Sequence, residues 1–190
     1  MINSSVPVSI ARQKGISLII VLILLVVIGL TAASAMRGAT SSQRVTNNVR
    51  MDVVAQQYAE AALRFCEAQL QLADAARVNS LKVAVIPAVD MTVGGATGAW
   101  ENPVSWNGPV GAGAAAATRT ALNAAQYSSA TSSYLPAKAP ECVAETQTLG
   151  SPTFTVTVVT ARGFSPDYQA DGAGNTTHGA VVWLQSILNL

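Results

Sequence analysis

Few side chains in this sequence have the types and spacing that catalysis or metal binding requires. The 190 residues include a single histidine, His178, and two cysteines, Cys66 and Cys142. A structural zinc site usually takes four cysteine or histidine ligands, so this set is too small. The chain has no GxxxxGK[ST] phosphate loop, no GxSxG elbow and no CxxC pair, and His178 lies in no recognised catalytic motif. The sequence therefore predicts neither an enzyme nor a metal-binding or cofactor-binding protein.

Oxygen ligands are concentrated in one stretch near the C-terminal end. Asp167, Asp171 and Asn175 are interspersed with glycines. Carboxylate and amide oxygens suit Ca²⁺, a hard cation, although this spacing differs from that of an EF-hand. We expect a solvated loop at 167–175, with a calcium site as the alternative.

The main structural element that the sequence predicts is an uninterrupted apolar segment. Half of the chain is hydrophobic and 11% is charged, yet residues 16–36 contain no charged side chain. As a helix this segment would be about 30 Å long, which matches the hydrocarbon core of a bilayer. Arg12 and Lys14 precede it and favour a cytoplasmic N-terminus with a translocated body. With 11 basic and 10 acidic residues, the chain has no electrostatic reason to bind nucleic acid.

The helical pattern continues beyond the apolar segment. No proline occurs between Pro7 and Pro87, and the sequence stays compatible with a helix to about Lys82. Apolar residues recur there at alternating steps of three and four, which predicts one buried stripe. The stripe consists of Met51, Val54, Tyr58, Ala61, Phe65, Ala68 and Leu72. We expect it to pack under the chain's own sheet, with neighbouring subunits as the alternative partner.

The distal part predicts a small sheet and a long surface excursion. Alternating or apolar runs at 142–148, 154–159 and 180–187 indicate three or four antiparallel strands. Residues 83–139 are rich in Ala, Gly, Ser, Thr and Pro and read largely as loop. Trp100 and Trp106 lie within that stretch and are candidate exposed anchors for a partner, although tryptophans also fill small cores.

The segment Arg12-Gln13-Lys14-Gly15, followed at once by Ile16-Ser17-Leu18, resembles the class III leader of type IV prepilins. The resemblance implies cleavage between Gly15 and Ile16 by a prepilin peptidase, and N-methylation of Ile16. A removable secretory signal, cut near 31–35, is the alternative. Most pilins carry a glutamate at the fifth residue after the glycine, where this chain has Ile20. The missing carboxylate points to a minor pilin.

The distal half is similar to the PilX-type minor pilins. The similar segments are Pro140-Glu141-Cys142, Phe154–Thr157 running into Arg162-Gly163, and Val181–Ser186. The resemblance implies an α+β, type IV pilin-like fold in which a long N-terminal helix packs on a small antiparallel sheet. The implied parts are a leader at 1–15, a transmembrane half at 16–36, an amphipathic half at 37–82 and a periplasmic body at 83–190. In the membrane half, the residues expected to pack on other helices are Leu18, Val21, Leu25 and Ile28.

What the resemblance implies about function is priming of pilus assembly and a place at or near the tip. The implied partners are other minor pilins, the major pilin, the prepilin peptidase, inner-membrane lipid and a large tip adhesin. The implied outcomes are twitching motility and adhesion. Two alternatives are a type II secretion tip pseudopilin, which usually has a larger body, and a bitopic periplasmic binding protein.

In a translocated chain, an even number of cysteines favours a disulfide bond. A bond between Cys66 and Cys142 would tie the helix to the sheet. Two free buried thiols are the alternative.

Overall fold

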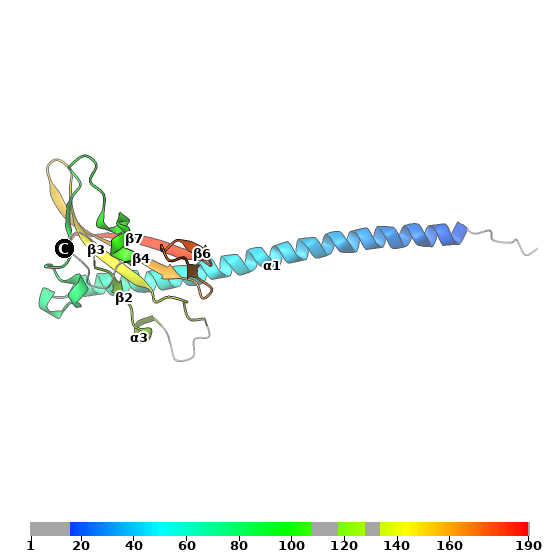
Figure 1. Cartoon of the computed structure of the whole chain (residues 1–190), viewed down its shortest axis with the longest axis horizontal. Coiled ribbons are helices and arrows are strands. Elements are labelled where there is room, and N and C mark those ends of the chain that lie inside the picture. Colours follow the sequence, from blue (N-terminus) through cyan, green and yellow to red (C-terminus); the bar gives the residue numbers. More distant parts are fainter. Residues whose placement is uncertain (1–15, 108–117, 128–133, 190) are drawn as a thin grey trace, which may run out of the picture. The chain divides into compact units, whose positions relative to one another are not determined.

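A computed structural model of the chain describes residues 16–107, 118–127 and 134–189 (Figure 1). The chain divides into two compact units, Met1–Thr46 and Asn47–Leu190. The first unit contains the apolar part of the N-terminal helix. The second contains the rest of that helix and all of the sheet. The expected leader, residues 1–15, lies outside the described residues.

Helix α1 runs from Ile16 to Leu70 without a break. Aliphatic residues and alanine dominate it, and several of its serine and threonine hydroxyls donate to carbonyls of the preceding turn. The hydroxyl of Thr31 donates to the carbonyl of Ile28 at 2.9 Å, and that of Ser34 donates to the carbonyl of Thr31 at 2.8 Å. Such bonds to the preceding turn allow serine and threonine to sit in a helix that offers no other partner.

The helix ends at Leu70 rather than at about Lys82, so the expected extension was too long. Arg77 folds back over the last turn and donates to the carbonyls of Leu70 at 2.7 Å and Leu72 at 3.0 Å. The amide of Val78 donates to the side chain of Gln69 at 3.0 Å. The bond from Arg77 to Leu70 satisfies a carbonyl of the last helical turn. The chain then buries Leu81 in the core through two short 3₁₀ turns, Asp74–Ala76 and Asn79–Leu81.

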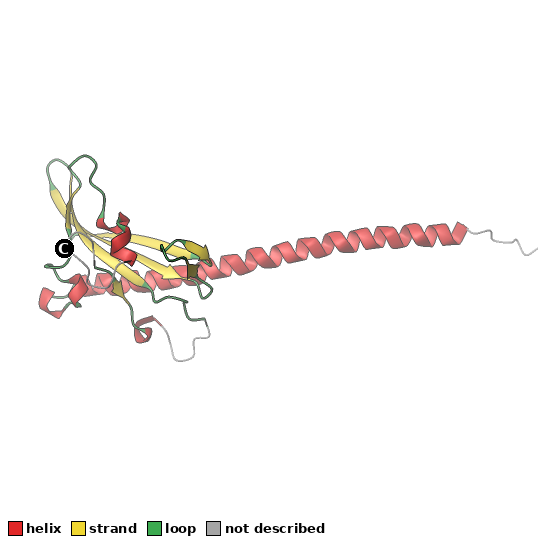
Figure 2. Ribbon diagram, viewed as in Figure 1, coloured by secondary structure: helices red, strands yellow, loops and turns green. Residues whose placement is uncertain are grey.

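The main sheet has the order β1-β3-β4-β7, with β2 paired to β3. Figure 2 shows the strands in yellow and the helices in red. Its strands are β1 (Ala88–Asp90), β2 (Thr120–Ala121), β3 (Glu141–Leu149), β4 (Phe154–Phe164) and β7 (Val181–Leu188). The three expected strands β3, β4 and β7 are antiparallel neighbours. Strand β1 is parallel to β3, so the sheet is mixed rather than purely antiparallel.

Short elements occupy stretches that were expected to be largely loop. Strands β5 (Gln169–Ala170) and β6 (Thr176–His178) form a small separate hairpin. The one-turn helices α2 (Pro103–Asn107) and α3 (Ala124–Tyr127) and the 3₁₀ turn Ala99–Glu101 follow β1 and flank β2. The segment 88–107 therefore has more structure than its composition predicts.

The buried face of α1 differs from the predicted stripe. Tyr58 is buried as expected, but Leu72 is 43% exposed and the other stripe residues are half-buried or exposed. The fully buried positions are instead Ala55, Ala59, Ala62, Cys66 and Leu70. Most of these side chains are small, and small residues let the backbone of a strand come close to the helix. Large stripe residues such as Phe65 pack at the margin of this contact.

Gly163 is where β4 comes closest to α1. A Cβ atom at this position would overlap the backbone of Ala55 and Ala59. Val159 and Ala161, respectively four and two residues earlier on the same strand face, pack into the core with Ala62 and Cys66. The sheet thus reaches α1 through side chains that become smaller toward the point of closest approach.

We expect Gly163→Ala to destabilise the protein by about 2 kcal/mol, because overpacking against backbone atoms cannot be relieved by a rotamer change. Chemical denaturation followed by tryptophan fluorescence would measure the loss. The matched control is Gly94→Ala, since nothing lies within 4 Å of a Cβ at Gly94. Equal stability of the two variants would contradict the close packing of β4 on α1.

Candidate assembly site

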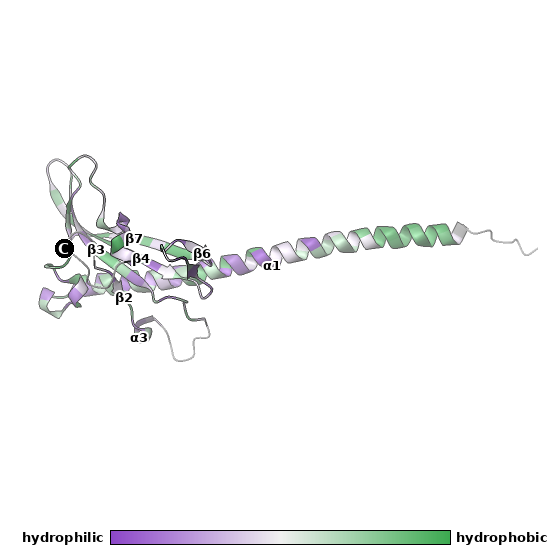
Figure 3. Cartoon of the chain, viewed as in Figure 1, coloured by the Kyte–Doolittle hydropathy of each residue, from purple (hydrophilic) through white to green (hydrophobic). Residues whose placement is uncertain are grey.

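The apolar half of α1 has no partner within the described part of the chain. Its large aliphatic side chains between Leu18 and Leu30 are 53–69% exposed, and Met36 is 70% exposed. In Figure 3 the ribbon of this part of α1 has the colour of hydrophobic residues over several consecutive turns. An 18-residue window of this helix has a mean hydropathy of 3.0 and no buried residues, so length and composition allow it to cross a membrane. Water is a poor solvent for such a surface, which is instead suited to contact with lipid or with other apolar helices.

The residues expected to pack between subunits lie within this exposed surface. Leu18, Val21, Leu25 and Ile28 recur at steps of three and four along α1 and are 53–69% exposed. Ile20 is 56% exposed, and the first turn of the helix contains no acidic residue. Ile16 begins the helix, while Gly15 lies outside the described residues. The apolar surface is therefore available on every side of α1 in this segment.

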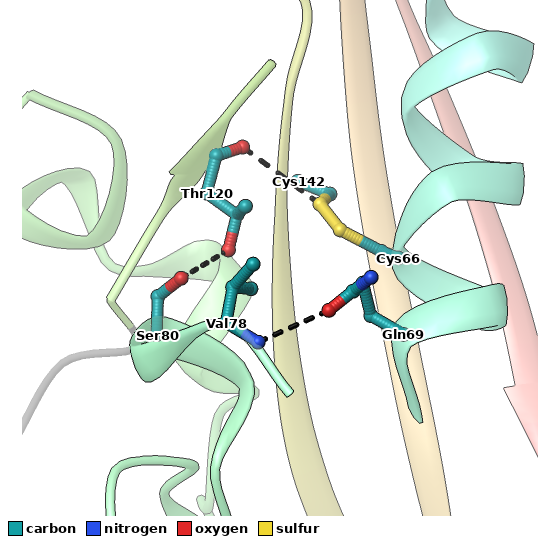
Figure 4. Close-up of a disulfide and its surroundings, with 6 residues drawn as sticks. All are labelled: Cys66, Gln69, Val78, Ser80, Thr120 and Cys142. Carbon is teal, nitrogen blue, oxygen red and sulfur yellow. Dashed lines mark hydrogen bonds between the residues drawn. A yellow bond between two sulfur atoms is a disulfide. The ribbon is translucent and has the colours of Figure 1, made fainter. Parts of the chain in front are cut away.

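A disulfide bond between Cys66 and Cys142 fastens α1 to β3 (Figure 4). The Cα atoms are 6.7 Å apart, both cysteines are fully buried, and the bond spans 76 residues. Beside it, Thr120 of β2 pairs in register with Cys142, and its hydroxyl forms a 2.6 Å hydrogen bond with that of Ser80. The disulfide thus lies where α1, the sheet and the segment after α1 meet.

A buried carboxylate organises the face of the sheet that is turned away from α1. The side chain of Glu141 is 1% exposed and accepts hydrogen bonds from Arg162 on β4 and, at 3.1 Å, from Lys138. Arg119 lies 3.7 Å from its second oxygen. Glu141 and Arg162 are direct partners in the β3–β4 register, so the pair follows from the strand pairing.

Trp106 is 3% exposed, so its prediction as an exposed partner anchor was wrong. Its indole NH donates to the carbonyl of Trp100 at 2.6 Å, and the Arg162 guanidinium lies 4.5 Å above its ring. Trp106 therefore covers the buried ion pair, and Trp100 is half-buried beside it. The exposed tryptophan is Trp183 on β7, at 43%, which the sequence reasoning did not single out. Strand alternation was the available signal, since it puts Trp183 on the same face as Ile187.

Glu145 is a second buried carboxylate on the same face of β3. It accepts hydrogen bonds from the amide of Ala99 and from the side chain of Gln147. Burial nevertheless raises the pKa of Glu145, and the repulsion of Glu101 adds to this effect, while the hydrogen bonds oppose it. These contacts hold the segment that contains Trp100 and Trp106 against the sheet.

In the 167–175 stretch, the oxygens of Asp171 are directed at their own loop. The carboxylate accepts hydrogen bonds from the amides of Ala173 at 2.9 Å and Asn175 at 2.8 Å, and from the Asn175 side chain at 2.9 Å. These bonds hold the pKa of Asp171 below its ordinary value. Asp167 lies 3.5 Å from the exposed His178. Within the described residues, no group of three or more His, Cys, Asp or Glu side chains is placed to hold a metal ion.

The fold and the apolar helix define the class of protein: a membrane-anchored, pilin-like α+β subunit. Residues 14–64 match the family model described as PilX N-terminal. The chain thus carries the N-terminal segment of a PilX-type type IV pilin, and its role is related to type IV pili. The comparisons with curated proteins and with solved structures find no match.

Reduction of the disulfide should lower stability by about 4 kcal/mol, because a bond across 76 residues restricts the unfolded chain strongly. Alkylation followed by intact-mass measurement should add two alkyl groups only after reductant and denaturant are present. Denaturation of the Cys66→Ala, Cys142→Ala double variant, with and without reductant, serves as the control. Labelling of both cysteines in the untreated protein would contradict the bond.

Glu145 should make stability depend on pH. Because its pKa is raised in the folded state, its contribution is fully present below its ordinary pKa and is lost as the pH rises through the raised value. The unfolding midpoint of the wild type relative to Glu145→Gln should therefore increase as the pH falls from 7 toward 4. Glu60→Gln controls for general acid effects, because the side chain of Glu60 is 41% exposed and forms its ion pair with another side chain of α1, Arg64. A difference between wild type and Glu145→Gln that stays constant with pH would exclude a raised pKa.

Proposed function

We propose that this chain is a minor pilin that primes type IV pilus assembly and remains at or near the pilus tip. The observation that carries the proposal is the apolar surface of α1, which has no partner in the described chain and no carboxylate at Ile20. The match of residues 14–64 to the PilX N-terminal family supports the same role.

The leader pattern at Gly15 supports the first step. A prepilin peptidase at the inner membrane cuts after Gly15 and methylates Ile16, so the mature chain begins with the apolar helix. The charged residues before the cut, Arg12 and Lys14, stay on the cytoplasmic side. The body lies in the periplasm.

Helix packing supports the second step. In the membrane, lipid covers the side chains of Leu18, Val21, Leu25 and Ile28, and in a pilus the helices of other pilins replace lipid. A carboxylate inside this apolar environment is costly unless it is paired, and Ile20 removes both the cost and the pairing. A subunit without that pairing is poorly suited to repeated addition along a shaft. It suits a priming complex with other minor pilins, on which the major pilin then adds.

The body supplies the surface that remains exposed when α1 is packed. The disulfide and the two buried carboxylates of β3 make it rigid, so it can present a fixed surface to the other minor pilins or to a large adhesin at the tip. Twitching motility and adhesion are the cellular outcomes of this role.

Deletion of the gene should strongly reduce the number of surface pili, because a filament without its priming subunit rarely starts. Electron microscopy of complemented cells would measure this number. The wild type should restore pili, whereas Gly15→Leu, which blocks cleavage after the leader, should not. Gly94→Leu is the control, since Gly94 lies in open space in the body.

The mass of the membrane form provides an independent check. The wild type should begin at Ile16 and carry one added methyl group. A chain that still begins at Met1 would favour a bitopic periplasmic protein, and normal piliation of the deletion strain would remove the priming role.

A further inference from the structure

The cluster around Glu141 contains more positive charge than it balances. Three cationic side chains converge on this one carboxylate: Arg162, Arg119 and Lys138. Arg162 is fully engaged, because it pairs with Glu141 and also donates to the carbonyl of Trp106 at 3.2 Å. Arg119 and Lys138 are less enclosed, with side chains 21% and 36% exposed. The surplus charge therefore lies at the outer side of the cluster.

A cavity of about 250 Å³ opens at that outer side. Arg119 and Lys138 line it together with Asn107, Tyr168 and Asp171. The Nε of Arg119 is buried and has no hydrogen-bond partner within the described residues, which is costly for a guanidinium. Asn107 and Tyr168 add polar groups to the wall, so the cavity has the composition of a polar ligand site rather than of a packing defect.

The other charged groups do not cancel this surplus. Asp171 lines the cavity, but its carboxylate already accepts three hydrogen bonds from its own loop. Asp171 and Glu141 carry two negative charges, and the three cations carry three positive charges, so one positive charge remains unbalanced. The pKa of Lys138 is lowered, mainly by burial and also by the repulsion of Arg162 and Arg119. Together these effects outweigh the attraction of Glu141, which raises the pKa. An additional negative charge in the cavity would relieve this repulsion.

We propose that this cavity binds an oxyanion, a carboxylate or phosphate group, with Arg119 and Lys138 as its principal ligands. Arginine presents several N–H donors in a plane that matches such groups, and lysine supplies a compact charge. Asn107, whose side-chain amide also donates to the carbonyl of Ala173 at 3.3 Å, and Tyr168 lie in the wall of the same cavity. This site is separate from the apolar surface of α1 and does not depend on the role in pilus priming.

The test uses the full chain in a non-ionic detergent, with sodium chloride keeping the ionic strength constant. Phosphate, glycerol phosphate and acetate are titrated separately, and the thermal unfolding midpoint is recorded. We expect a saturable increase with at least one of these anions, because a ligand that binds the folded state alone stabilises it. A stronger response to glycerol phosphate than to phosphate assigns a phosphate ester, and a response to acetate alone assigns a carboxylate.

Lys138→Met and Lys138→Gln should each weaken anion binding at least tenfold, measured as the anion concentration that gives half of the increase in unfolding midpoint. Both variants remove the positive charge, and glutamine keeps a hydrogen-bond donor near Glu141. Arg64→Met is the matched control, because Arg64 is 80% exposed on α1 and pairs with Glu60. The midpoints in chloride alone report whether each variant is folded. Tryptophan fluorescence at constant temperature gives a second readout, since Trp106 and Trp183 both lie against Arg162. The absence of any saturable response in the wild type, or a response in both Lys138 variants equal to that of the wild type, would overturn the proposal.

Discussion

The structure of the body depends on the close approach of one strand to one helix. Gly163 of β4 lies against the backbone of α1 at Ala55 and Ala59, and only a residue without a Cβ fits there. The disulfide between Cys66 and Cys142 holds the neighbouring strand at the same helix face. Once these two contacts are made, the register of β3, β4 and β7 determines which side chains face the helix and which face away.

Strand alternation then creates a second, polar layer on the opposite face of the sheet. Arg162 precedes Gly163 and so points away from α1, where it meets its register partner Glu141. A buried ion pair is costly unless its groups are well paired and shielded. The segment that contains Trp106 covers this ion pair. The amide of Ala99, in the same segment, donates a hydrogen bond to Glu145 and so holds the segment in place. The same geometry leaves surplus positive charge beside the cavity lined by Arg119 and Lys138.

Helix α1 has to suit two different environments. Its first half has large aliphatic residues on all sides, which suits lipid and the tightly packed helices of a filament. Its second half has small residues on the face toward the sheet and charged residues elsewhere, which suits a body in water. Hydropathy separates the two halves along one continuous helix (Figure 3). This division of one helix into an apolar half and an amphipathic half is the basis of the membrane-anchored, pilin-like architecture.

The sequence alone determined the features that depend on local order along the chain. The apolar segment 16–36 and the alternating strands β3, β4 and β7 were predictable, because hydrophobic length and period are local properties. Tertiary structure decided which of two adjacent helix faces is buried. Small residues such as Ala55 and Ala59 are buried in preference to larger ones because the backbone of β4 must come close there. It also decided that α1 ends at Leu70, where Arg77 caps the last turn. The pairing of Glu141 with Arg162 and the burial of Trp106 were likewise not predictable, because residues distant in the chain meet only through strand register.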